Sequence, residues 1–597
     1  MAYKNYILVC GGTGCLSSRG GEIYTALQRE AEAQGVKDEV QIVKTGCFGF
    51  CARGPIVKVL PQESFYVDVK PEDAKEIISE QVVKGREVKR LLYRKEGAGD
   101  ALKAKVEDID FYKKQYRIVL RNCGVINPEN IDEYIARDGY KALEKVLFDM
   151  TPDQVIEELK KAGLRGRGGA GFPTWIKWNA TKSAPGDTKY VVCNADEGDP
   201  GAYMNRSTIE GDPHSIIESM IIAGHTIGAH HGFIYIRAEY PLAVERLKIG
   251  IKQATDYGLL GKNILGSGFD FDLEIRLGAG AFVCGEETAL IQSLEGKRGM
   301  PVPKPPFPAQ HGLWGCPTVI NNVETYANVS IILVKGADWF SKIGTEKSKG
   351  TKTFALTGKI NNSGLVEVPF GTTLREIIFD IGGGIKGGKK FRGVQTGGPS
   401  GGIITEESLD EPISYESLIA LGSMMGSGGM IIMDEDDCPV DIAKFYMNFC
   451  VDESCGKCSP CRIGTKQMLG ILERISKGNG EPGDIEKLEQ IGSAMKKAAL
   501  CALGQSAPNP TLSTIRHFRD EYMEHIVDHK CRSGKCRHLV VYEIDPTKCI
   551  GCGLCARHCP IPCIGGEKKE PHVIDKTKCI KCGECFRTCK FGAVVKK

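Results

Sequence analysis

The chain has 597 residues, 42% hydrophobic and 26% charged, which is enough for roughly four globular domains. Its 78 Lys and Arg and 75 Asp and Glu leave a formal charge of +3, so it has no general attraction to nucleic acid or to an anionic membrane. The N-terminal apolar run is too short for a signal peptide, and no stretch reaches the roughly 20 apolar residues of a membrane-spanning helix. We expect a cytoplasmic protein with no membrane segment and no nucleic-acid partner.

Residues 1–90 predict a small α/β domain, with strands at 6–10, 39–44 and 56–60 and helices at 22–34 and 71–84. Two cysteine pairs follow the first two strands, Cys10-x4-Cys15 and Cys47-x3-Cys51, and neither has the Cys-x-x-Cys spacing of redox disulfides. Four thiolates on two loops suit a [2Fe–2S] cluster, with a zinc site or free thiols as alternatives. The arrangement resembles the thioredoxin-like ferredoxins.

Five further segments are predicted from composition and periodicity. Residues 91–115 are charged and contain glycine, so we interpret them as a linker. Residues 116–345 alternate strands (190–193, 232–236) with amphipathic helices (151–162, 242–257), which predicts a Rossmann-like α/β domain. Residues 346–432 predict a β-grasp (SLBB-like) insert with strands at 353–358 and 364–369 and a helix at 374–381. A helical domain (433–540) and a cysteine-rich tail (541–597) follow.

The α/β domain contains a glycine-rich loop at 163–174, Gly-Leu-Arg-Gly-Arg-Gly-Gly-Ala-Gly-Phe-Pro-Thr. Glycine lets a backbone approach a phosphate or a planar ring closely, although a plain structural loop can have a similar sequence. Companion motifs make the loop more specific: Cys-Asn-Ala-Asp-Glu-Gly-Asp-Pro-Gly at 193–201, a second glycine loop with paired acids at 278–290, Pro-Lys-Pro-Pro-Phe at 303–307 and Asn-Asn-Val-Glu-Thr at 321–325.

Together these motifs closely resemble the FMN- and NADH-binding flavoprotein subunit of respiratory complex I and its soluble hydrogenase and formate dehydrogenase relatives, over about residues 120–505. The resemblance implies that FMN is held by Gly166, Arg167, Gly168, Lys177, Asn194, Asp196, Glu197, Gly285, Glu286, Asn321, Asn322 and Thr325. It implies that NAD(H) or NADP(H) contacts Phe172, Asp199, Glu287, Lys304 and Phe307. Two positions depart from complex I proteins, which commonly have Glu at Asp199 and often Phe at Ala180.

The chain contains 25 cysteines, and their spacing favours metal ligation over disulfides. The triplet at 455–461 and a later cysteine match the helical-domain [4Fe–4S] site of the same family: Cys455, Cys458, Cys461 and Cys501. The tail carries the bacterial two-cluster ferredoxin run twice, in which the fourth cysteine of each run ligates the other cluster. One predicted [4Fe–4S] set is Cys549, Cys552, Cys555 and Cys589, and the other is Cys579, Cys582, Cys585 and Cys559. A structural zinc module is the alternative.

Between the helical domain and the tail, one histidine and three cysteines could form a closed zinc site: His525, Cys531, Cys536 and Cys563. His529 is the alternative histidine, and unconnected side chains are the alternative to a site. We interpret Cys450 as an ordinary buried thiol. We interpret His230 and His231 as a surface pair, and Cys123, Cys193, Cys284, Cys316 and Cys438 as packing residues.

The domain order resembles the β subunit of electron-bifurcating or NAD(P)-reducing [FeFe]-hydrogenases. The resemblance implies FMN, one [2Fe–2S] and three [4Fe–4S] clusters, with hydride passing between NAD(P)H and FMN and single electrons through the clusters. It implies a hetero-oligomer with a hydrogenase catalytic subunit, a small thioredoxin-like [2Fe–2S] subunit and soluble ferredoxin. Because clusters are predicted at both ends of the chain, our hypothesis is that FMN is a branch point. The alternatives are the β subunit of an NAD-dependent formate dehydrogenase and a cysteine-rich zinc module for partner binding, which the near-neutral charge opposes.

Overall fold

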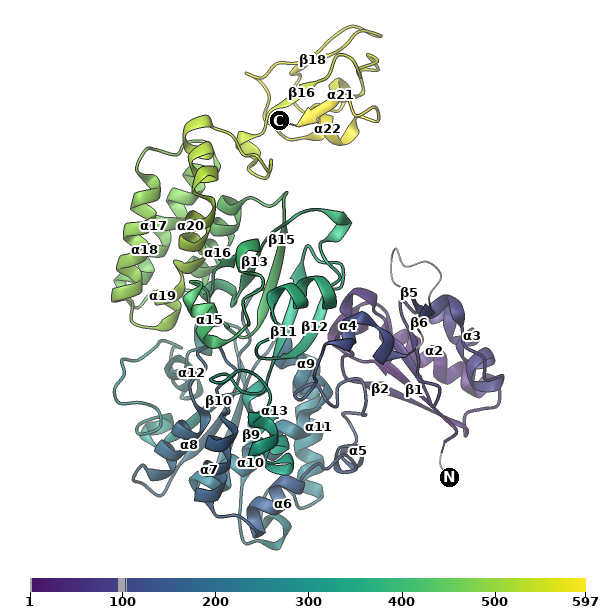
Figure 1. The fold of residues 1–597 in the computed structure, drawn as a ribbon, viewed down its shortest axis with the longest axis vertical. Coiled ribbons are helices and arrows are strands. Elements are labelled where there is room, and N and C mark those ends of the chain that lie inside the picture. The colour runs from purple at the N-terminus through teal and green to yellow at the C-terminus, as the bar shows by residue number, and fades with distance from the viewer. Residues whose placement is uncertain (1–2, 95–101, 104, 597) are drawn as a thin grey trace. The chain divides into compact units, whose positions relative to one another are not determined.

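The computed structural model describes residues 3–94, 102–103 and 105–596. The chain divides into two compact units (Figure 1). The first contains Met1–Lys389 and Gly393–Ile432, and the second contains Lys390–Arg392 and Met433–Lys597. Part of the predicted linker, 95–101 and 104, lies outside the described residues.

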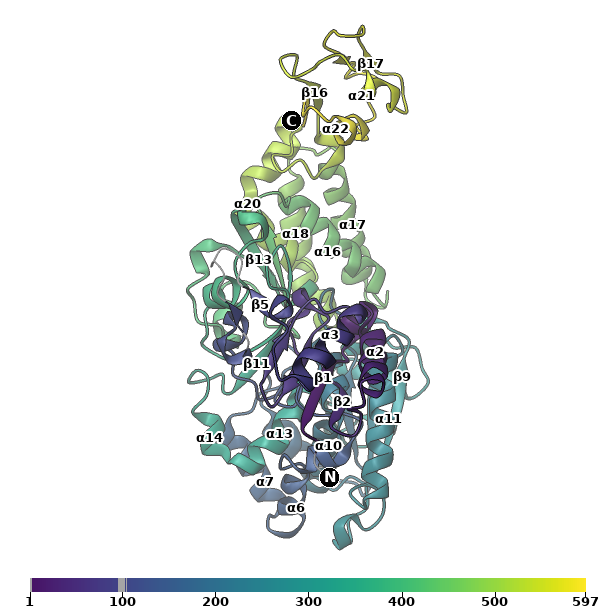
Figure 2. The same cartoon turned by 90° about the vertical axis from the view of Figure 1, so that its right-hand side faces the viewer.

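The N-terminal module is a four-stranded sheet in the order β2-β1-β3-β4. β1 (Asn5–Cys10) runs parallel to β2 (Val40–Thr45) and antiparallel to β3 (Val57–Leu60), which pairs with β4 (Ser64–Tyr66). After the short α1 (Thr13–Ser17), α2 (Gly20–Ala33) packs against β1 and β2, as Figure 2 shows. The predicted helix at 71–84 is composite: a 3-10 turn, α3 (Ala74–Glu76) and a π-helical segment, Ile77–Val83.

The segment predicted as a linker is partly packed, which differs from that expectation. A 3-10 turn at Lys89–Leu91 precedes the small pair β5 (Tyr93–Arg94) and β6 (Leu102–Lys103). In α4 (Asp110–Lys113), Phe111 and Tyr112 are buried, and the Phe111 ring stacks on Phe50 at 4.3 Å between centroids. Aromatic burial therefore holds the end of this segment against the N-terminal module.

The central domain is built on four parallel strands in the order β10-β7-β8-β9. They are β10 (Thr318–Asn322), β7 (Tyr190–Ala195), β8 (His231–Arg237) and β9 (Asp272–Gly278). The continuous apolar runs of β7 and β8 are typical of parallel strands covered by helices. The helices are α5 (Ile131–Ile135), α6 (Lys141–Phe148), α7 (Pro152–Ala162), α8 (Thr174–Ser183), α9 (Met204–Gly211), α10 (Pro213–Ile227), α11 (Pro241–Asp256), α12 (Glu287–Leu294), α13 (Val323–Lys335) and α14 (Ala337–Ser341).

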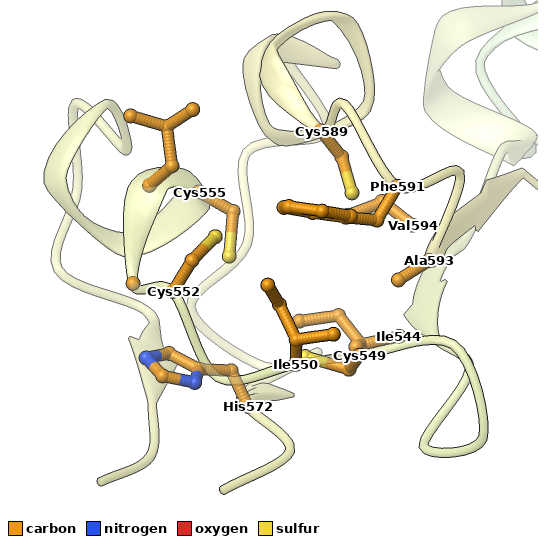
Figure 3. Close-up of a pocket in the computed structure, with 12 residues that line it drawn as sticks. Ile544, Cys549, Ile550, Cys552, Cys555, His572, Cys589, Phe591, Ala593 and Val594 are labelled. Carbon is orange, nitrogen blue, oxygen red and sulfur yellow. The ribbon is translucent and has the colours of Figure 1, made fainter. Parts of the chain in front are cut away.

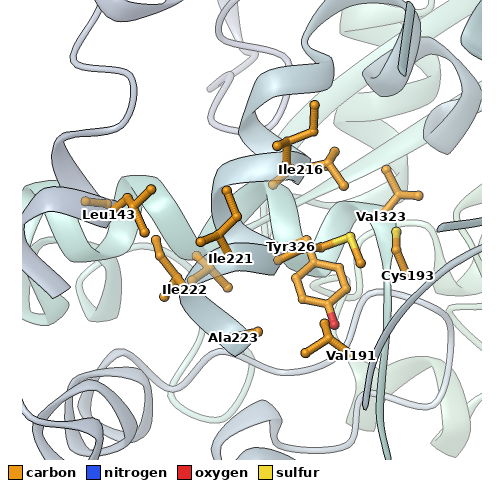
Figure 4. Packing of buried hydrophobic residues seen from close by; sticks show 14 of the residues in the cluster. Leu143, Val191, Cys193, Ile216, Ile221, Ile222, Ala223, Val323 and Tyr326 are labelled. Atoms are coloured by element: carbon orange, nitrogen blue, oxygen red, sulfur yellow. The ribbon is translucent and has the colours of Figure 1, made fainter. Parts of the chain in front are cut away.

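The largest core of this domain lies between the sheet and helices α10 and α13. Figure 4 shows Ile216 and Ile221 of α10 near Tyr326 of α13, with Val191 and Cys193 from strand β7. The hydroxyl of Tyr326 is satisfied because it donates to the Val192 carbonyl at 3.2 Å. This packing makes the carboxyl ends of β7 and β10 rigid, and that edge is where open α/β sheets bind ligands.

The next sheet has mixed strands in the order β12-β11-β15-β13-β14. β11 (Thr351–Gly358) runs antiparallel to β12 (Gly364–Pro369) and parallel to β15 (Gly429–Asp434), and β13 (Phe391–Thr396) is antiparallel to β14 (Ile403–Ile404). The predicted helix at 374–381 is a π-helix over Glu376–Ile381, and α15 (Tyr415–Ala420) follows. A β-grasp insert remains our interpretation of this sheet.

The helical part contains α16 (Pro439–Glu453), α17 (Ser459–Ser476), α18 (Asp484–Ala498), α19 (Ala502–Ser506) and α20 (Asn509–Met523). α16 packs on both α17 and α20, and Met447, Met468 and Leu472 are fully buried there. In the described part of the chain, no helix is both long and apolar enough to span a membrane.

The tail has two matching halves. β16 (Tyr542–Ile544) pairs with β19 (Val594–Lys596), and β17 (Ile564–Gly565) pairs with β18 (Val573–Ile574). α21 (Leu554–Arg557) and α22 (Glu584–Thr588) each follow a left-handed glycine, Gly553 (φ 68°) or Gly583 (φ 76°). Glycine adopts this conformation at little cost, so each cysteine run can turn directly into its helix.

Candidate functional site

The glycine-rich loop is a hairpin-like turn closed by backbone contacts. Gly166 N–H donates to the Phe172 carbonyl at 2.8 Å, and Arg165 bridges to Pro173. A Cβ at Gly171 would lie 2.7 Å from the Tyr415 ring, and its φ of 65° is left-handed. The position therefore requires glycine, because a side chain would be both strained and obstructed.

The loop is attached to the first turn of α13. Arg167 N–H donates to Thr325 Oγ1 at 2.8 Å, and a Cβ at Gly168 would approach Asn322 Cβ at 3.3 Å. The loop, Asn322 and Thr325 thus come together.

The Arg167 side chain bonds to backbone carbonyls of its surroundings. It is fully buried and donates to three carbonyls: Thr351 at 3.1 Å, Arg165 at 2.7 Å and Lys349 at 2.7 Å. Because these bonds use the guanidinium, we expect any contact of this residue with a cofactor to come from its backbone.

Amide side chains gather at the carboxyl ends of the two neighbouring strands. Asn194 of β7 and Asn322 of β10 are register partners. Asn194 Nδ2 donates to the Gly285 carbonyl at 2.9 Å, and Trp178 Nε1 donates to Asn321 Oδ1 at 2.8 Å. The second glycine loop and helix α8 are therefore joined to this sheet edge.

Two lysines and two glutamates form a charged group beside the same edge. Lys177 Nζ lies 2.9 Å from Glu287, and Lys304 Nζ lies 2.9 Å from Glu287 and 3.2 Å from Glu286. Although burial alone would raise it, Lys177 and Lys304 lower the pKa of Glu287 to about 2. Glu286 also caps α12 by accepting from the Thr288 and Ala289 N–H groups at 2.9 and 3.0 Å. Lysine cations in such a group can exchange partners and hold phosphate.

Two buried acids of the 193–201 motif have unusual acidity. Burial raises the pKa of Glu197 to about 7 and that of Asp199 to about 6. Glu197 accepts from the Asn205 and Arg206 N–H groups at 3.0 and 3.2 Å, so it fixes the start of α9. Both acids can exchange a proton near neutral pH.

Phe172 and Phe307 are the exposed aromatic side chains of the predicted nucleotide contacts, at 48% and 54%. Their free faces can stack on a planar ring. A glycine-rich loop, amide groups at two strand ends, lysine and open aromatic rings together fit a phosphate-bearing flavin and a second nucleotide.

The four N-terminal cysteines form one group. The thiols of Cys15 and Cys47 interact with Cys10 and raise its pKa, and Cys51 interacts with Cys47. The Gly49 N–H donates to Cys47 Sγ at 3.3 Å. Four sulfurs with a backbone donor are the set that a [2Fe–2S] cluster uses.

The helical-domain cysteines also come together. Burial, together with the charges of Cys458, Cys501 and Cys455, raises the pKa of Cys461 to about 11. Ser454 Oγ lies 3.3 Å from Cys461 Sγ. The triplet at the start of α17 and the cysteine before α19 thus face one point.

The tail brings its cysteines together across the two runs. Cys549, Cys552, Cys555 and Cys589 line one pocket with Ile544, Ile550 and Phe591 (Figure 3). In the other half, burial and the charges of Cys579 and Cys582 raise the pKa of Cys585. Cys563 interacts with both Cys559 and Cys579, so Cys559 lies close to the second run. Apolar side chains around thiolates limit solvent and affect the redox potential of a bound cluster.

The predicted zinc set needs one correction. The ligand atoms of Cys438, His525, Cys531 and Cys536 all lie within 4.8 Å of one another, and all four residues are buried. Cys563 is not in this group, because its Sγ lies 3.4 Å from Cys559 Sγ in the tail. Cys438, which the sequence alone suggests is a packing residue, takes the place of Cys563 in this group. The signal was weak, since Cys438 stands alone before α16, far from its partners in sequence.

The histidine of this group is already oriented for a metal. His525 Nδ1 lies 2.7 Å from the Glu521 carbonyl, so it is the donating nitrogen, and Nε2 faces Cys438 Sγ at 3.4 Å. A second hydrogen bond that fixes the tautomer is typical of zinc-binding histidines. His529 is outside the group.

The other cysteines lie apart from these groups. Cys123, Cys193, Cys284 and Cys450 are buried, and Cys316 is half-buried. His230 and His231 are exposed next to strand β8, as predicted.

Five families match successive parts of the chain. The thioredoxin-like [2Fe-2S] ferredoxin family matches residues 2–81, the Nuo51 FMN-binding domain 159–331 and the NADH-ubiquinone oxidoreductase-F iron-sulfur binding region 441–525. Two 4Fe-4S binding domains match 542–565 and 573–594. Fold and sites together define an FMN and iron–sulfur oxidoreductase subunit.

Individual relatives identify the family. The chain is 61% identical over 485 residues to the NADP-reducing hydrogenase subunit HndC of Solidesulfovibrio fructosivorans, covering 81% of this chain and 99% of that protein. It is 45% identical over 414 residues to an F-type subunit of the NADH-quinone oxidoreductase of Rhizobium meliloti, covering 69% and 98%. A solved NAD+-reducing [NiFe]-hydrogenase in the H2-reduced state is similar with a TM-score of 0.62 and 28% identity, covering 88% of this chain and 85% of that one. The chain belongs to the family of flavoprotein subunits that includes HndC and the F-type subunits of NADH-quinone oxidoreductase.

Proposed function

We propose that the chain exchanges hydride between NAD(H) or NADP(H) and FMN and passes single electrons to iron–sulfur clusters, as a subunit of a cytoplasmic hydrogenase complex. One observation carries the proposal. The same chain contains a glycine loop with amide groups at the carboxyl edge of the central sheet, and four separate groups of four cysteines. Bound FMN accepts two electrons together and releases them singly, which is the chemistry that clusters need.

The residues of the sheet edge have distinct roles in this proposal. The loop backbone at Gly166–Gly168 approaches the flavin phosphate and ribityl chain, and Lys177 supplies a cation. The amides of Asn194, Asn321 and Asn322 hold the polar edges of the flavin. The remaining predicted flavin contacts are Asp196, Glu197, Gly285, Glu286 and Thr325. The support is that these residues converge from the glycine loop, two strand ends and two helices.

The nicotinamide nucleotide would bind on the open side of the same edge. Phe172 and Phe307 offer exposed rings for stacking, while Glu287 and Lys304 offer opposite charges for ribose and phosphate. Asp199, which is largely protonated below pH 6, can donate or accept a hydrogen bond at the carboxamide.

The cysteine groups would hold one [2Fe–2S] and three [4Fe–4S] clusters, which corresponds to roughly 14 iron atoms per chain. The group Cys438, His525, Cys531 and Cys536 would hold zinc, since one histidine and three cysteines make a closed structural site. Within the described residues no cysteine forms a disulfide.

We propose a branch at the flavin, with one route through the Cys455 cluster towards a hydrogenase catalytic subunit and another through the tail towards soluble ferredoxin. A small thioredoxin-like [2Fe–2S] subunit would complete the hetero-oligomer. The relatives named as hydrogenases favour this complex over a formate dehydrogenase. Production of NAD(P)H from hydrogen at full rate without ferredoxin would exclude an obligatory branch.

The flavin assignment is tested with two lysines of helix α8. Lys177→Gln removes the cation at the sheet edge, whereas Lys182→Gln changes a lysine that pairs with exposed Asp153 at 2.6 Å. Loss of a charge-assisted contact predicts at least a tenfold weaker FMN affinity in K177Q and unchanged affinity in K182Q.

The measurement is FMN, iron and sulfide content of anaerobically purified protein, with FMN affinity from fluorescence titration and NAD(P)H-driven dye reduction as the activity. Equal FMN affinity in both variants would contradict the role of Lys177. Parent protein that contains neither flavin nor iron would contradict the proposed function itself.

A further inference from the structure

The loop that carries Cys47 and Cys51 is bound by a later part of the same unit. The Ala52 N–H donates to the Ser363 carbonyl at 2.9 Å, and the Leu365 N–H donates to the Gly49 carbonyl at 2.7 Å. These bonds extend strand β12 onto the cysteine loop. The loop that carries two of the N-terminal cysteines is therefore joined to the mixed sheet of the same unit.

A tyrosine from the central domain reaches this group. Tyr203, at the start of α9, donates its hydroxyl hydrogen to Cys51 Sγ at 3.8 Å. That distance is within the range for a hydrogen bond to the larger sulfur atom. The contact joins a side chain of the flavin-binding domain to a predicted cluster ligand.

The Tyr203 side chain is held in place by its own segment. Arg206 lies over its ring at 5.6 Å from the centroid. The carboxylate of Glu197 fixes the following turn through the Asn205 and Arg206 N–H groups. Glu197 is itself a predicted flavin contact, so one short segment connects the flavin edge with the cysteine group.

The Tyr203 hydroxyl is a donor at neutral pH, because a phenol ordinarily keeps its proton there. Cys47 has its own donor, the Gly49 N–H. Two of the four sulfurs thus accept hydrogen bonds, one from each domain.

We propose that Tyr203 raises the redox midpoint potential of the [2Fe–2S] cluster by donating a hydrogen bond to Cys51 Sγ. The proposal rests on the proposed function, because it requires the cluster. When the cluster accepts one electron that originates from NAD(P)H, negative charge on its sulfurs increases. A hydrogen bond to sulfur therefore stabilises the reduced cluster more than the oxidised one.

The test compares two tyrosines beside the cluster in the full chain. Tyr203→Phe removes only the hydroxyl that reaches sulfur. Tyr112→Phe is the matched control, because the Tyr112 hydroxyl donates to the Phe48 carbonyl at 3.0 Å and not to a sulfur. In Y112F that carbonyl keeps Arg117 as a donor at 3.2 Å.

The measurement is an anaerobic redox titration followed by the electron paramagnetic resonance of the reduced [2Fe–2S] cluster. In Y203F we expect about a tenfold shift of the equilibrium towards the oxidised cluster, which is about 59 mV for one electron. Y112F should titrate like the parent protein.

A second measurement tests the hydrogen bond independently of the redox potential. Pulsed resonance in D2O should detect an exchangeable deuteron coupled to the parent cluster and weaker coupling in Y203F. An unchanged potential and coupling in Y203F, or an equal shift in Y112F, would overturn the proposal. A parent chain without any [2Fe–2S] signal would instead contradict the proposed function.

Discussion

At the scale of single residues, the cysteines show that spacing along the sequence and proximity in the folded chain give different information. The ferredoxin runs and the 455–461 triplet are compact in sequence, so spacing alone predicts most of their ligands. The zinc-type group combines Cys438 with His525, 87 positions later, and only folding brings them together. Cys563 was a reasonable candidate by residue type but lies beside Cys559.

This difference gives a sharp prediction. Cys438→Ser should weaken zinc binding at least tenfold, because it removes one of four ligands from a closed site. Cys563→Ser should leave zinc binding unchanged. Zinc content by elemental analysis and competition with a chromogenic chelator measure the effect.

Cys450→Ser serves as the control, since Cys450 is buried in α16, the helix that begins directly after Cys438, but is outside the group. Zinc that is retained in C438S and lost in C563S would show that the ligand set is wrong.

At the scale of elements, short backbone segments position the cofactor sites. Helix α9 follows the 193–201 motif. Tyr203 immediately precedes the helix, and the Glu197 carboxylate accepts from an N–H group of its first turn. Strand β12 extends onto the Cys47–Cys51 loop. These contacts depend on close backbone approach, which hydrophobic periodicity does not reveal.

Gly364 of β12 is the position where this approach is closest. A Cβ there would lie 2.0 Å from the Gly49 carbonyl oxygen, so Gly364→Ala should force the cysteine loop away from the strand. We expect a destabilisation of about 1–3 kcal/mol, typical of overpacking, and a lower [2Fe–2S] content per chain. Calorimetry and the resonance signal of the reduced cluster measure the two effects.

Gly470→Ala is the matched control for this substitution. Gly470 lies in α17, where a Cβ would meet no atom within 4 Å. Alanine in an exposed helix should be neutral or stabilising by about 1 kcal/mol. Equal behaviour of G364A and G470A would contradict the role of β12 in holding the loop.

At the scale of the whole molecule, the chain contains more cysteine groups than a single linear route from a flavin requires. We expect Cys552→Ser combined with Cys582→Ser to remove roughly eight iron atoms per chain, because each substitution deletes one ligand of a tail cluster. NAD(P)H-driven dye reduction should continue, since the flavin edge is unchanged, whereas reduction of ferredoxin should be lost.

Iron analysis and parallel dye and ferredoxin assays measure this outcome, with Cys316→Ser as the control because Cys316 belongs to none of the cysteine groups. Continued ferredoxin reduction by the double variant would show that electrons leave by another route.

The sequence alone predicted the thioredoxin-like ferredoxin module, the FMN-binding domain, the helical iron–sulfur region and the two-part ferredoxin tail, and the family matches support these four. It could do so because thiolate spacing and glycine loops are local properties of the chain, and local geometry limits which cofactors fit. The order of motifs also sufficed to identify the flavoprotein relationship, which the family matches support.

Only the tertiary structure decided the long-range contacts. It placed Cys438 in the zinc-type group, turned the Arg167 side chain towards carbonyls and brought Tyr203 to Cys51. It also packed Phe111 and Tyr112 of the predicted linker against the N-terminal module. These contacts join residues far apart in sequence through burial and backbone approach, and neither has a periodic or spacing signal along the chain.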